Sequence, residues 1–262
     1  MCGAGVLPAQ MAAEARRRGW RVVAFAFDGA PDMSRWADRT VPSRLTELGP
    51  VLAGLQQEGV TAVLLAGRFA HRDIVAGPAD AAVGEIVERA GGLVDTDLLS
   101  AVARTLSALG ITLLDQREFL GADLAPAGCW SSRAPSEAEW RDVRAGFRLA
   151  HILAAARIGQ AVVVKRGAVV AVEALEGTSA AVRRGTALSG PGAVIVKVAA
   201  RDHDYRFDTP TIGLETLEAA AAGGAAVVAV EAERVLVIDR DAMVARADAA
   251  GIALVSVADV AT

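Results

Sequence analysis

The chain has 262 residues, a formal net charge of −4 at pH 7 and 53% hydrophobic residues, with few aromatics. This length can bury a sizeable core in one large domain or two small ones, and an acidic balance without a basic run argues against nucleic acid as the main partner. Two cysteines are too few for a disulfide framework or a zinc site. The longest apolar run, 219–230, is shorter than the roughly 18 residues of a membrane span, so we expect a cytoplasmic protein without a signal peptide.

Residues 1–120 alternate helix-like and strand-like patterns. Helices are expected at Pro8 to Arg18, Leu45 to Glu58 and Leu98 to Leu109, and short apolar strands at Arg21 to Phe27, Ala62 to Leu65 and Ile111 to Leu114. Short buried strands that alternate with helices are typical of a parallel, doubly wound sheet. The first half is therefore predicted to be an α/β domain.

Gly3-Ala-Gly5, followed by a helix that starts near Pro8, has the pattern of a phosphate-binding turn. In such a turn the amides of a helix N-terminus point at an anion. A single Gly-x-Gly is weak evidence, and the strand that should precede it is absent because the chain starts at Met1. We therefore expect a truncated N-terminus that lacks the first strand.

A stretch without a clear period, 122–133, predicts a domain boundary, which we set between residues 128 and 129. Ser136, with Glu139 three residues later, is the signature of a capping box. The helix that follows keeps apolar residues at helical spacing, and Gly159 is expected to end it.

The second half, 129–262, is predicted to be a separate α/β domain with a mixed sheet. Two apolar strands, 160–164 and 168–173, flank Lys165-Arg-Gly167 and predict a β-hairpin. A short helix, capped by Thr178 or Ser179, is expected next. Further strands are expected at 193–198, 225–230, 234–238 and 252–257, and helices at 214–222 and 241–250.

Charged side chains follow several strands of this second half. They comprise three carboxylates and two cations: Glu173, Glu176, Asp208, Lys197 and Arg206. Converged in one cleft, these groups would suit a phosphate ester or anhydride held with a divalent cation, with a carboxylate that positions the metal or a water. Such an ion would be bound by oxygen and resemble magnesium. The alternative is that these residues only cap turns and face solvent.

Two further observations bear on the chemistry. Only Lys165 and Lys197 are lysine among 27 basic residues, so a retained lysine could mark a place that needs a compact ammonium. Asp95 and Asp97 form a second acidic group. The alternative is that Asp97 lies in the first turn of its helix, where a negative charge is favourable. Nucleophilic triads fit poorly, because no serine lies in a Gly-x-Ser-x-Gly elbow.

Several motifs in fixed order resemble the LpxI-type UDP-2,3-diacylglucosamine pyrophosphatases of lipid A synthesis. The main ones are Ile158-Gly-Gln-Ala-Val-Val-Val-Lys165, Ala171-Val-Glu-Ala-Leu-Glu-Gly-Thr178 and Arg206-Phe-Asp-Thr-Pro-Thr-Ile-Gly213. The likeness extends to Gly3-Ala-Gly-Val-Leu-Pro8, Arg133-Ala-Pro-Ser-Glu-Ala-Glu139 and Val228-Ala-Val-Glu-Ala232. It covers nearly the whole chain, which makes it more specific than any one motif.

The resemblance implies a magnesium-dependent hydrolase, with manganese as the alternative ion, that splits UDP-2,3-diacylglucosamine into UMP and 2,3-diacylglucosamine 1-phosphate. It implies a Rossmann-like N-terminal domain over 1–128, with the first strand missing, and an α/β C-terminal domain over 129–262. The lipid would be bound between the domains. Peripheral contact with the inner membrane surface and a homodimer are left open.

By the same resemblance, Asp208 falls on the essential aspartate of the family, and Lys197 and Arg206 join it as the expected catalytic residues. The expected metal ligands are Asp208, Glu173, Glu176 and Asp95. The expected substrate contacts are Gly3, Gly5, Gln160, Gly177, Thr178 and Thr211.

The chain departs from the family pattern at three places. Val94-Asp95-Thr96 stands where Gly-Asp-Asp is usual, His71-Arg72 where an Arg-Pro pair is expected, and Ser179 where an aspartate is expected. A diverged or non-catalytic nucleotide-sugar or lipid-binding protein of the same fold is therefore the alternative interpretation. A dinucleotide-binding oxidoreductase is a third, but the chain lacks Gly-x-Gly-x-x-Gly.

Overall fold

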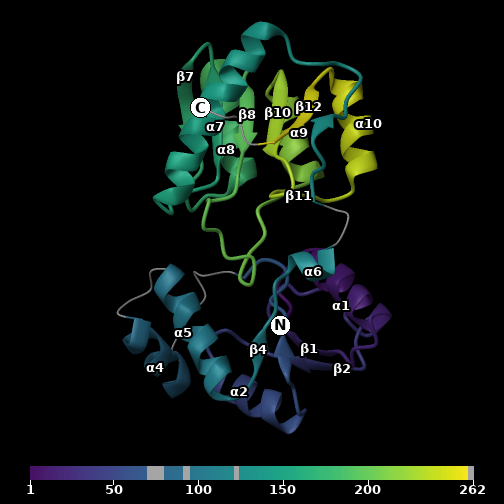
Figure 1. Cartoon of the computed structure of the whole chain (residues 1–262), viewed down its shortest axis with the longest axis vertical. Coiled ribbons are helices and arrows are strands. Elements are labelled where there is room, and N and C mark those ends of the chain that lie inside the picture. Colours follow the sequence, from purple (N-terminus) through teal and green to yellow (C-terminus); the bar gives the residue numbers. More distant parts are fainter. Residues whose placement is uncertain (70–79, 91–94, 121–123, 259–262) are drawn as a thin grey trace. The chain divides into compact units, whose positions relative to one another are not determined.

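The computed structural model describes residues 1–69, 80–90, 95–120 and 124–258, and it divides into two compact units (Figure 1). Unit 1 consists of Met1–Leu120 together with Asp204–Asp208, and unit 2 of Gly121–His203 together with Thr209–Thr262. Five residues late in the sequence therefore pack with the first unit, although the chain on both sides of them belongs to the second.

Unit 1 combines short parallel strands with helices. Strand β1 (Val23–Ala26) pairs with β2 (Arg39–Pro42), and β3 (Ala62–Val63) pairs with β4 (Thr112–Leu113). Cys2 forms parallel bridges with both Ala26 and Ala66, so the first residues of the chain run between these two pairs. The helices are α1 (Leu7–Arg17), α2 (Leu48–Gln57), α4 (Ala81–Ala90), α5 (Asp95–Ala108) and α6 (Arg117–Leu120).

Unit 2 is built on a six-stranded mixed sheet in the order β5-β12-β10-β8-β6-β7. Its strands are β5 (Gly128–Cys129), β6 (Ala161–Lys165), β7 (Ala168–Val172), β8 (Val194–Lys197), β10 (Val227–Glu231) and β12 (Ala253–Val257). Strands β8, β10 and β12 are parallel, whereas β5, β6 and β7 each run antiparallel to a neighbour. The predicted mixed sheet is confirmed. A small parallel pair, β9 (Thr211–Ile212) and β11 (Leu236–Val237), accompanies it.

Helices cover both faces of this sheet, which explains why its central strands are apolar along their whole length. Helix α7 (Glu137–Ala155) packs on one face, where Phe147 meets Val162 and Val196. Helices α8 (Thr178–Ser189), α9 (Leu214–Ala222) and α10 (Arg240–Ala250) pack on the other, against alternate residues such as Val163 and Ile195. Strand side chains alternate between two buried faces, as a period of two requires.

Local signals predicted the ends of the sheet's hairpin and the start of α7. The Ser136 side chain accepts from the Glu139 amide and the Glu139 side chain accepts from the Ser136 amide, so the capping box is confirmed. Strands β6 and β7 form the predicted hairpin, with Arg166 and Gly167 both at positive φ (51° and 78°). Two consecutive positive φ values are the mark of the tight turns that suit hairpin twist.

Two predictions about helix ends are wrong. Helix α7 ends at Ala155 rather than at Gly159, and Gly159 is needed instead because a Cβ there would lie 2.1 Å from the carbonyl oxygen of Glu173. Neither Thr178 nor Ser179 caps α8, since Gly177 is its N-cap and no side chain caps it. The Thr178 hydroxyl instead donates to the carboxylate of Glu173.

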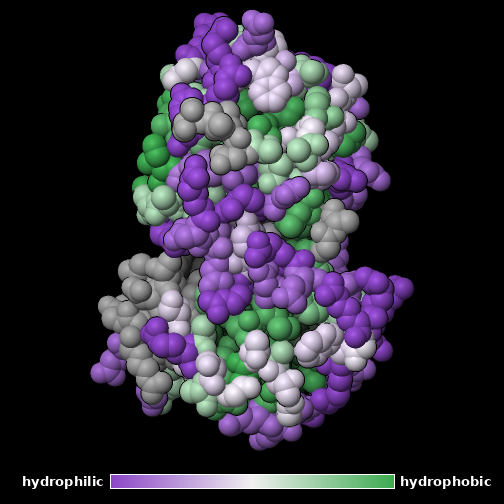
Figure 2. Space-filling view, viewed as in Figure 1, coloured by the Kyte–Doolittle hydropathy of each residue, from purple (hydrophilic) through white to green (hydrophobic). Residues whose placement is uncertain are grey.

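The surface shows hydrophilic residues between scattered apolar ones on the face drawn in Figure 2. Apolar side chains with high exposure include Ile152, Leu175 and Leu188. Within the described part of the chain, each helix is too short or too polar to cross a membrane.

Candidate functional site

Three of the polar residues that the sequence singled out, Glu173, Thr178 and Lys197, lie together at one end of the strands of the unit 2 sheet. The register places Lys197, at the carboxyl end of β8, opposite Ala161 at the start of β6 and opposite Val230 near the end of β10. Glu173 directly follows β7, whose end lies beside the start of β6. Open α/β sheets bind ligands outside the carboxyl ends of their parallel strands, so this end of the strands is the candidate site of unit 2.

A chain of hydrogen bonds links Lys197, Thr178 and Glu173 at this end of the strands. Lys197 Nζ donates to Thr178 Oγ1 at 2.7 Å, and the Thr178 hydroxyl donates to Glu173 Oε1 at 2.6 Å. The other carboxylate oxygen of Glu173 accepts from the backbone amide of Gln160 at 3.1 Å. An ammonium can only donate and a carboxylate can only accept, so the direction of the threonine hydroxyl is fixed by its two partners.

The charged groups of Lys197 and Glu173 are both buried. Lys197 is 6% exposed and Glu173 is 8% exposed, and charged groups removed from water need hydrogen-bonding partners to offset the cost of desolvation. An ammonium has three N–H donors, one of which goes to Thr178. The geometry therefore holds a lysine at the end of a strand, where its remaining donors suit an anionic ligand.

Glu176 stands apart from this buried chain. It is exposed, its carboxylate pairs with Arg184, and it accepts from the Ala174 amide at 3.1 Å. The hydrogen bond from the Arg184 guanidinium lowers the pKa of Glu176 below its usual range. The predicted metal pair Glu173 and Glu176 therefore divides into one carboxylate bound to Thr178 and another bound to an arginine. Gly177, between these elements, adopts a φ of 82°.

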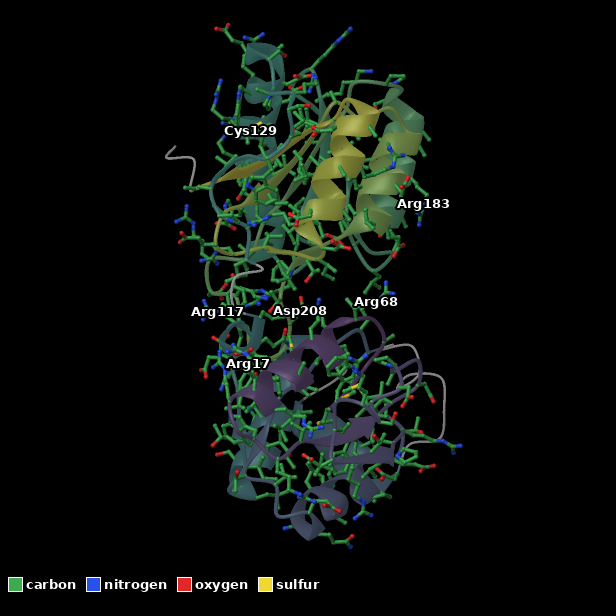
Figure 3. All side chains as sticks on the ribbon, turned by 90° about the vertical axis from the view of Figure 1, so that its right-hand side faces the viewer. Arg17, Arg68, Arg117, Cys129, Arg183 and Asp208 are labelled. Carbon is green, nitrogen blue, oxygen red and sulfur yellow. The ribbon has the colours of Figure 1, made fainter. Side chains whose placement is uncertain are left out.

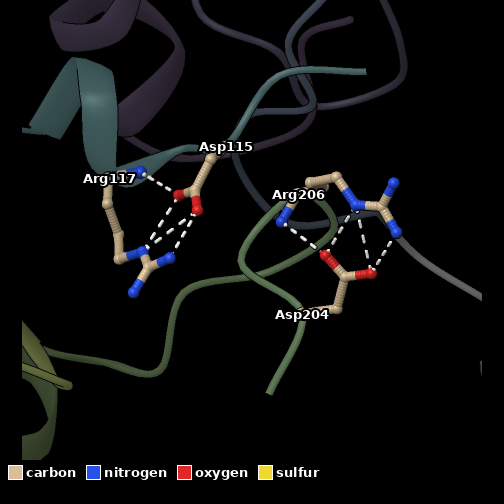
Figure 4. A network of polar contacts seen from close by, with 4 residues as sticks. All are labelled: Asp115, Arg117, Asp204 and Arg206. Atoms are coloured by element: carbon tan, nitrogen blue, oxygen red, sulfur yellow. Dashed lines mark hydrogen bonds and ion pairs between the residues drawn. The ribbon is translucent and has the colours of Figure 1, made fainter. Parts of the chain in front are cut away.

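Arg206 belongs to unit 1, where it lies in a group of four charged side chains (Figure 4). Its guanidinium donates to both carboxylate oxygens of Asp204 at 2.6 and 2.9 Å, and Arg117 makes the same kind of pair with Asp115. The hydrogen bond from Arg117 holds the pKa of Asp115 below its usual range, and the hydrogen bond to Asp204 raises the pKa of Arg206.

Tyr205 fixes this short segment on unit 1. Its ring is buried, and the Arg117 guanidinium lies 4.0 Å from the ring centre, within the range of a cation–π interaction. The Gln116 amide donates to the Tyr205 carbonyl at 3.0 Å. The segment that carries Arg206 and Asp208 is therefore held by both backbone and side-chain contacts.

Asp208 is exposed at the end of this segment, and Figure 3 shows it at the same end of unit 1 as Arg68. The backbone of Arg68 pairs with Ala4, in the middle of the predicted phosphate-binding turn. A Cβ on Gly3 would lie 2.4 Å from the Arg68 carbonyl oxygen, so Gly3 permits this pairing, and Gly5 has a φ of 104°.

The other predicted residues lie in separate places. The Thr211 hydroxyl, in unit 2, donates to the Thr209 carbonyl at 2.6 Å. Asp95 is the first residue of α5, and its side chain, like Val94 and His71-Arg72, lies outside the described residues. Ser179 Oγ lies 3.3 Å from Thr216 Oγ1, within hydrogen-bond distance.

No three histidine, cysteine, aspartate or glutamate side chains of the described ranges form a group that could hold a metal ion. Magnesium needs fewer protein ligands, because it is bound by one or two carboxylates and completes its shell with water and substrate phosphate oxygens. The exposed carboxylate of Asp208 fits such a role. Both carboxylate oxygens of Glu173 accept hydrogen bonds, from Thr178 and from the Gln160 amide.

The sequence did not single out three residues that lie at the same end of the unit 2 strands. Glu231 ends β10 and is 5% exposed, His151 Nε2 lies 3.6 Å from its Oε1, and Arg234 Nε lies 3.3 Å from the same oxygen. A charged residue at the end of a buried apolar strand was the signal available for Glu231. Nothing in the spacing of His151 or Arg234 indicated that they meet it.

Both halves of the chain match one protein family. Residues 1–122 match the LpxI N-terminal domain and residues 126–255 match the LpxI C-terminal domain. The chain is also 30% identical over 270 residues to the UDP-2,3-diacylglucosamine pyrophosphatase LpxI of Caulobacter vibrioides, an alignment that spans 98% of this chain and 96% of that protein. The resemblance based on ordered motifs is confirmed, and the chain belongs to the LpxI family.

Proposed function

We propose that the chain hydrolyses the diphosphate of UDP-2,3-diacylglucosamine to UMP and 2,3-diacylglucosamine 1-phosphate, as a step of lipid A biosynthesis. The observation that carries this proposal is the match to a pyrophosphatase of that name along nearly the whole length of both proteins. The buried lysine at the carboxyl end of β8 agrees with it, because an ammonium at a strand end suits a phosphate ligand.

The residues take separate roles in this proposal. Lys197 and Arg206 neutralise charge on phosphate oxygens, while Thr178 and Glu173 hold the Lys197 ammonium in place. Asp208 orients the attacking water or contributes a carboxylate to a magnesium ion. When bound, such an ion, or manganese in its place, would supply positive charge beside the phosphate oxygens. Glu176 and Asp95 are weaker candidates as ligands, and Gly3, Gly5, Gln160, Gly177 and Thr211 remain proposed substrate contacts.

A Rossmann-like arrangement of unit 1 is part of the proposal. Its support is the order of parallel segments: β2 pairs with β1, residues near Cys2 bridge β1 to the chain after β3, and β3 pairs with β4. In that order the residues near Cys2 take the central place, with parallel neighbours on both sides, as the central strand of a doubly wound fold has. Because the substrate is a lipid, we also propose a cytoplasmic protein that contacts the inner membrane surface peripherally.

The test is product formation from UDP-2,3-diacylglucosamine, followed by phosphorus NMR with and without magnesium. Wild-type protein is compared with Asp208→Ala, and with Asp241→Ala as a control at an exposed aspartate of α10. We expect UMP and 2,3-diacylglucosamine 1-phosphate from the wild type and the control, and a loss of both products in Asp208→Ala. Tight substrate binding by calorimetry without any product would instead identify a binding protein.

A further inference from the structure

Glu231 is a buried carboxylate at the end of β10 that bonds the backbone of the loop after β8. It ends β10 and is 5% exposed. Its Oε2 accepts from the backbone amide of Ala199 at 2.9 Å, and Arg234 lies 3.3 Å from its Oε1. A buried carboxylate needs hydrogen-bond donors to offset the loss of hydration. The bond from the Ala199 amide therefore ties the end of β10 to the residue two places after Lys197.

Arg234 binds the next two residues of the same loop. Its Nη2 donates to the carbonyl of Ala200, and it lies 3.3 Å from the carbonyl oxygen of Arg201. Three consecutive backbone groups, at residues 199, 200 and 201, are therefore held by Glu231 and Arg234 together. We name this arrangement the 199–201 clamp. A guanidinium presents several donors in a fixed plane, which suits binding a carboxylate and two carbonyls at once.

The clamp acts on the start of the loop that carries the proposed catalytic residues. Lys197 lies two residues before Ala199, the first clamped residue, and Asp204–Asp208, which include Arg206 and Asp208, begin three residues after Arg201. A turn in which the His203 amide donates to the Ala200 carbonyl at 3.0 Å continues from the clamp. The path of the loop between the two sets of residues thus begins at a point fixed by side chains of β10 and its following turn.

We propose that Glu231 and Arg234 are positioning residues, which fix the backbone of residues 199–201 and so the loop that leaves β8 after Lys197. The kinetic part of this proposal rests on the proposed function. Neither residue is assigned contact with substrate. His151, whose Nε2 lies 3.6 Å from Glu231, closes the remaining side of the carboxylate.

The alternative is that the clamp only stabilises unit 2. The two interpretations differ in where an effect is seen. If the clamp only stabilises unit 2, its removal should speed amide hydrogen exchange throughout the unit. If it positions the loop, its removal should speed exchange at residues 199–203 and lower kcat in protein that is still folded. Because the proposal gives the clamp residues no contact with substrate, kcat should fall much more than KM changes.

The experiment compares Arg234→Ala, Arg234→Lys and Glu231→Gln with Arg246→Ala as the matched control. Arg246 makes a bidentate pair with Glu218, which joins α10 to α9 rather than to the loop. Hydrogen–deuterium exchange is measured on peptides that cover 199–203 and on peptides from β8, β10 and α7. Kinetics of diphosphate hydrolysis are measured on the same preparations, with and without millimolar guanidinium.

We expect faster exchange confined to 199–203 in Arg234→Ala and Glu231→Gln, and wild-type exchange in the Arg246→Ala control. We expect kcat of Arg234→Ala to fall by about 10- to 100-fold, the scale of a displacement of about 1 Å at a site, with partial recovery in guanidinium or as Arg234→Lys. If Arg234→Ala does not fold, Glu231→Gln, which keeps the shape of the side chain, carries the test.

Wild-type exchange at 199–203 in the variants would overturn the clamp, and so would faster exchange with a wild-type kcat. A uniform rise of exchange across unit 2 would also overturn it in favour of simple stabilisation. If the wild-type protein forms no product, the proposed function fails. Exchange at 199–203 then decides the clamp alone, because that measurement does not depend on turnover.

Discussion

Gly159→Ala tests how the backbone supports Glu173. A Cβ at this position would lie 2.1 Å from the Glu173 carbonyl oxygen and 2.7 Å from the carbonyl carbon. Ordinary contacts of a Cβ begin at 3.4 Å, so the carbonyl oxygen would have to retreat by about 1.3 Å. The obstacle is backbone at the end of β7, which cannot move aside as the tip of a flexible side chain can.

The displacement has an energetic cost and a functional one. Overpacking of this kind costs about 1–3 kcal/mol. The movement would also weaken the bond from the Glu173 amide to the Ala161 carbonyl, 2.9 Å long, and the bond from Thr178 to the carboxylate. Each such bond contributes about 1 kcal/mol, so we expect Gly159→Ala to lower the free energy of unfolding by about 2–4 kcal/mol. A shift of about 1 Å at Glu173 should lower kcat by about 100-fold.

The matched control is Gly84→Ala in α4, where a Cβ would meet nothing within 4 Å. Alanine in a helix is more stable than glycine by roughly 0.5–1 kcal/mol, so this variant should unfold at a slightly higher temperature than the wild type. Thermal unfolding by circular dichroism and the phosphorus NMR assay are run on both variants. Equal stability and turnover of Gly159→Ala and the wild type would refute the steric argument.

Three further predictions concern single side chains. Lys197→Met should lower kcat by about 10²- to 10³-fold, since it removes a charged donor at the proposed site; wild-type kcat in the NMR assay would remove Lys197 from the proposal. Asp142→Ala leaves the amides of Arg166 and Gly167, each 2.7 Å from its carboxylate, without that acceptor, and should lower the free energy of unfolding by about 1–3 kcal/mol, measured by urea titration. Asp115→Asn should reduce the loss of stability in acid: the folded-state pKa lies below 3.8, so the stability from this carboxylate is present above pH 3.8 and is lost as pH falls through the folded-state pKa. Melting temperatures of wild type and variant should therefore differ most above that range and converge below it.

The features of the fold that the sequence predicted correctly depend on residues close together in the chain. Ser136 and Glu139 satisfy each other's backbone amides within one turn of helix, and Gly167 supplies a turn at the hairpin, so both features depend on residues close in sequence. The mixed sheet followed from the same kind of evidence, since a hairpin within a run of α/β units requires antiparallel pairing. The predicted elements of both halves were found close to their expected positions.

The predictions that were wrong depend on contacts between residues that are far apart in the sequence. Gly159 was taken for a helix stop because glycine commonly ends helices, but its role depends on Glu173, which the hairpin brings back against it. Threonine is a common N-cap residue, but the Thr178 hydroxyl bonds Lys197 of β8 and Glu173 at the end of β7. Glu231 and Arg234 meet the loop after Lys197 only because β10 lies beside β8.

The scarcity of lysine shows how far composition alone can indicate a site. Lys165 and Lys197 are the only lysines among 27 basic residues, and both use the compact donor geometry of an ammonium. Lys165 Nζ donates to the carbonyls of Ser189 and Pro191, both at 2.7 Å, where a positive charge is favourable at the C-terminus of α8. Its role is therefore structural. Lys197 differs because it is buried at a strand end and its hydroxyl partner is tied to a carboxylate. The identity of its partners, rather than its rarity, is what favours Lys197 as a functional residue.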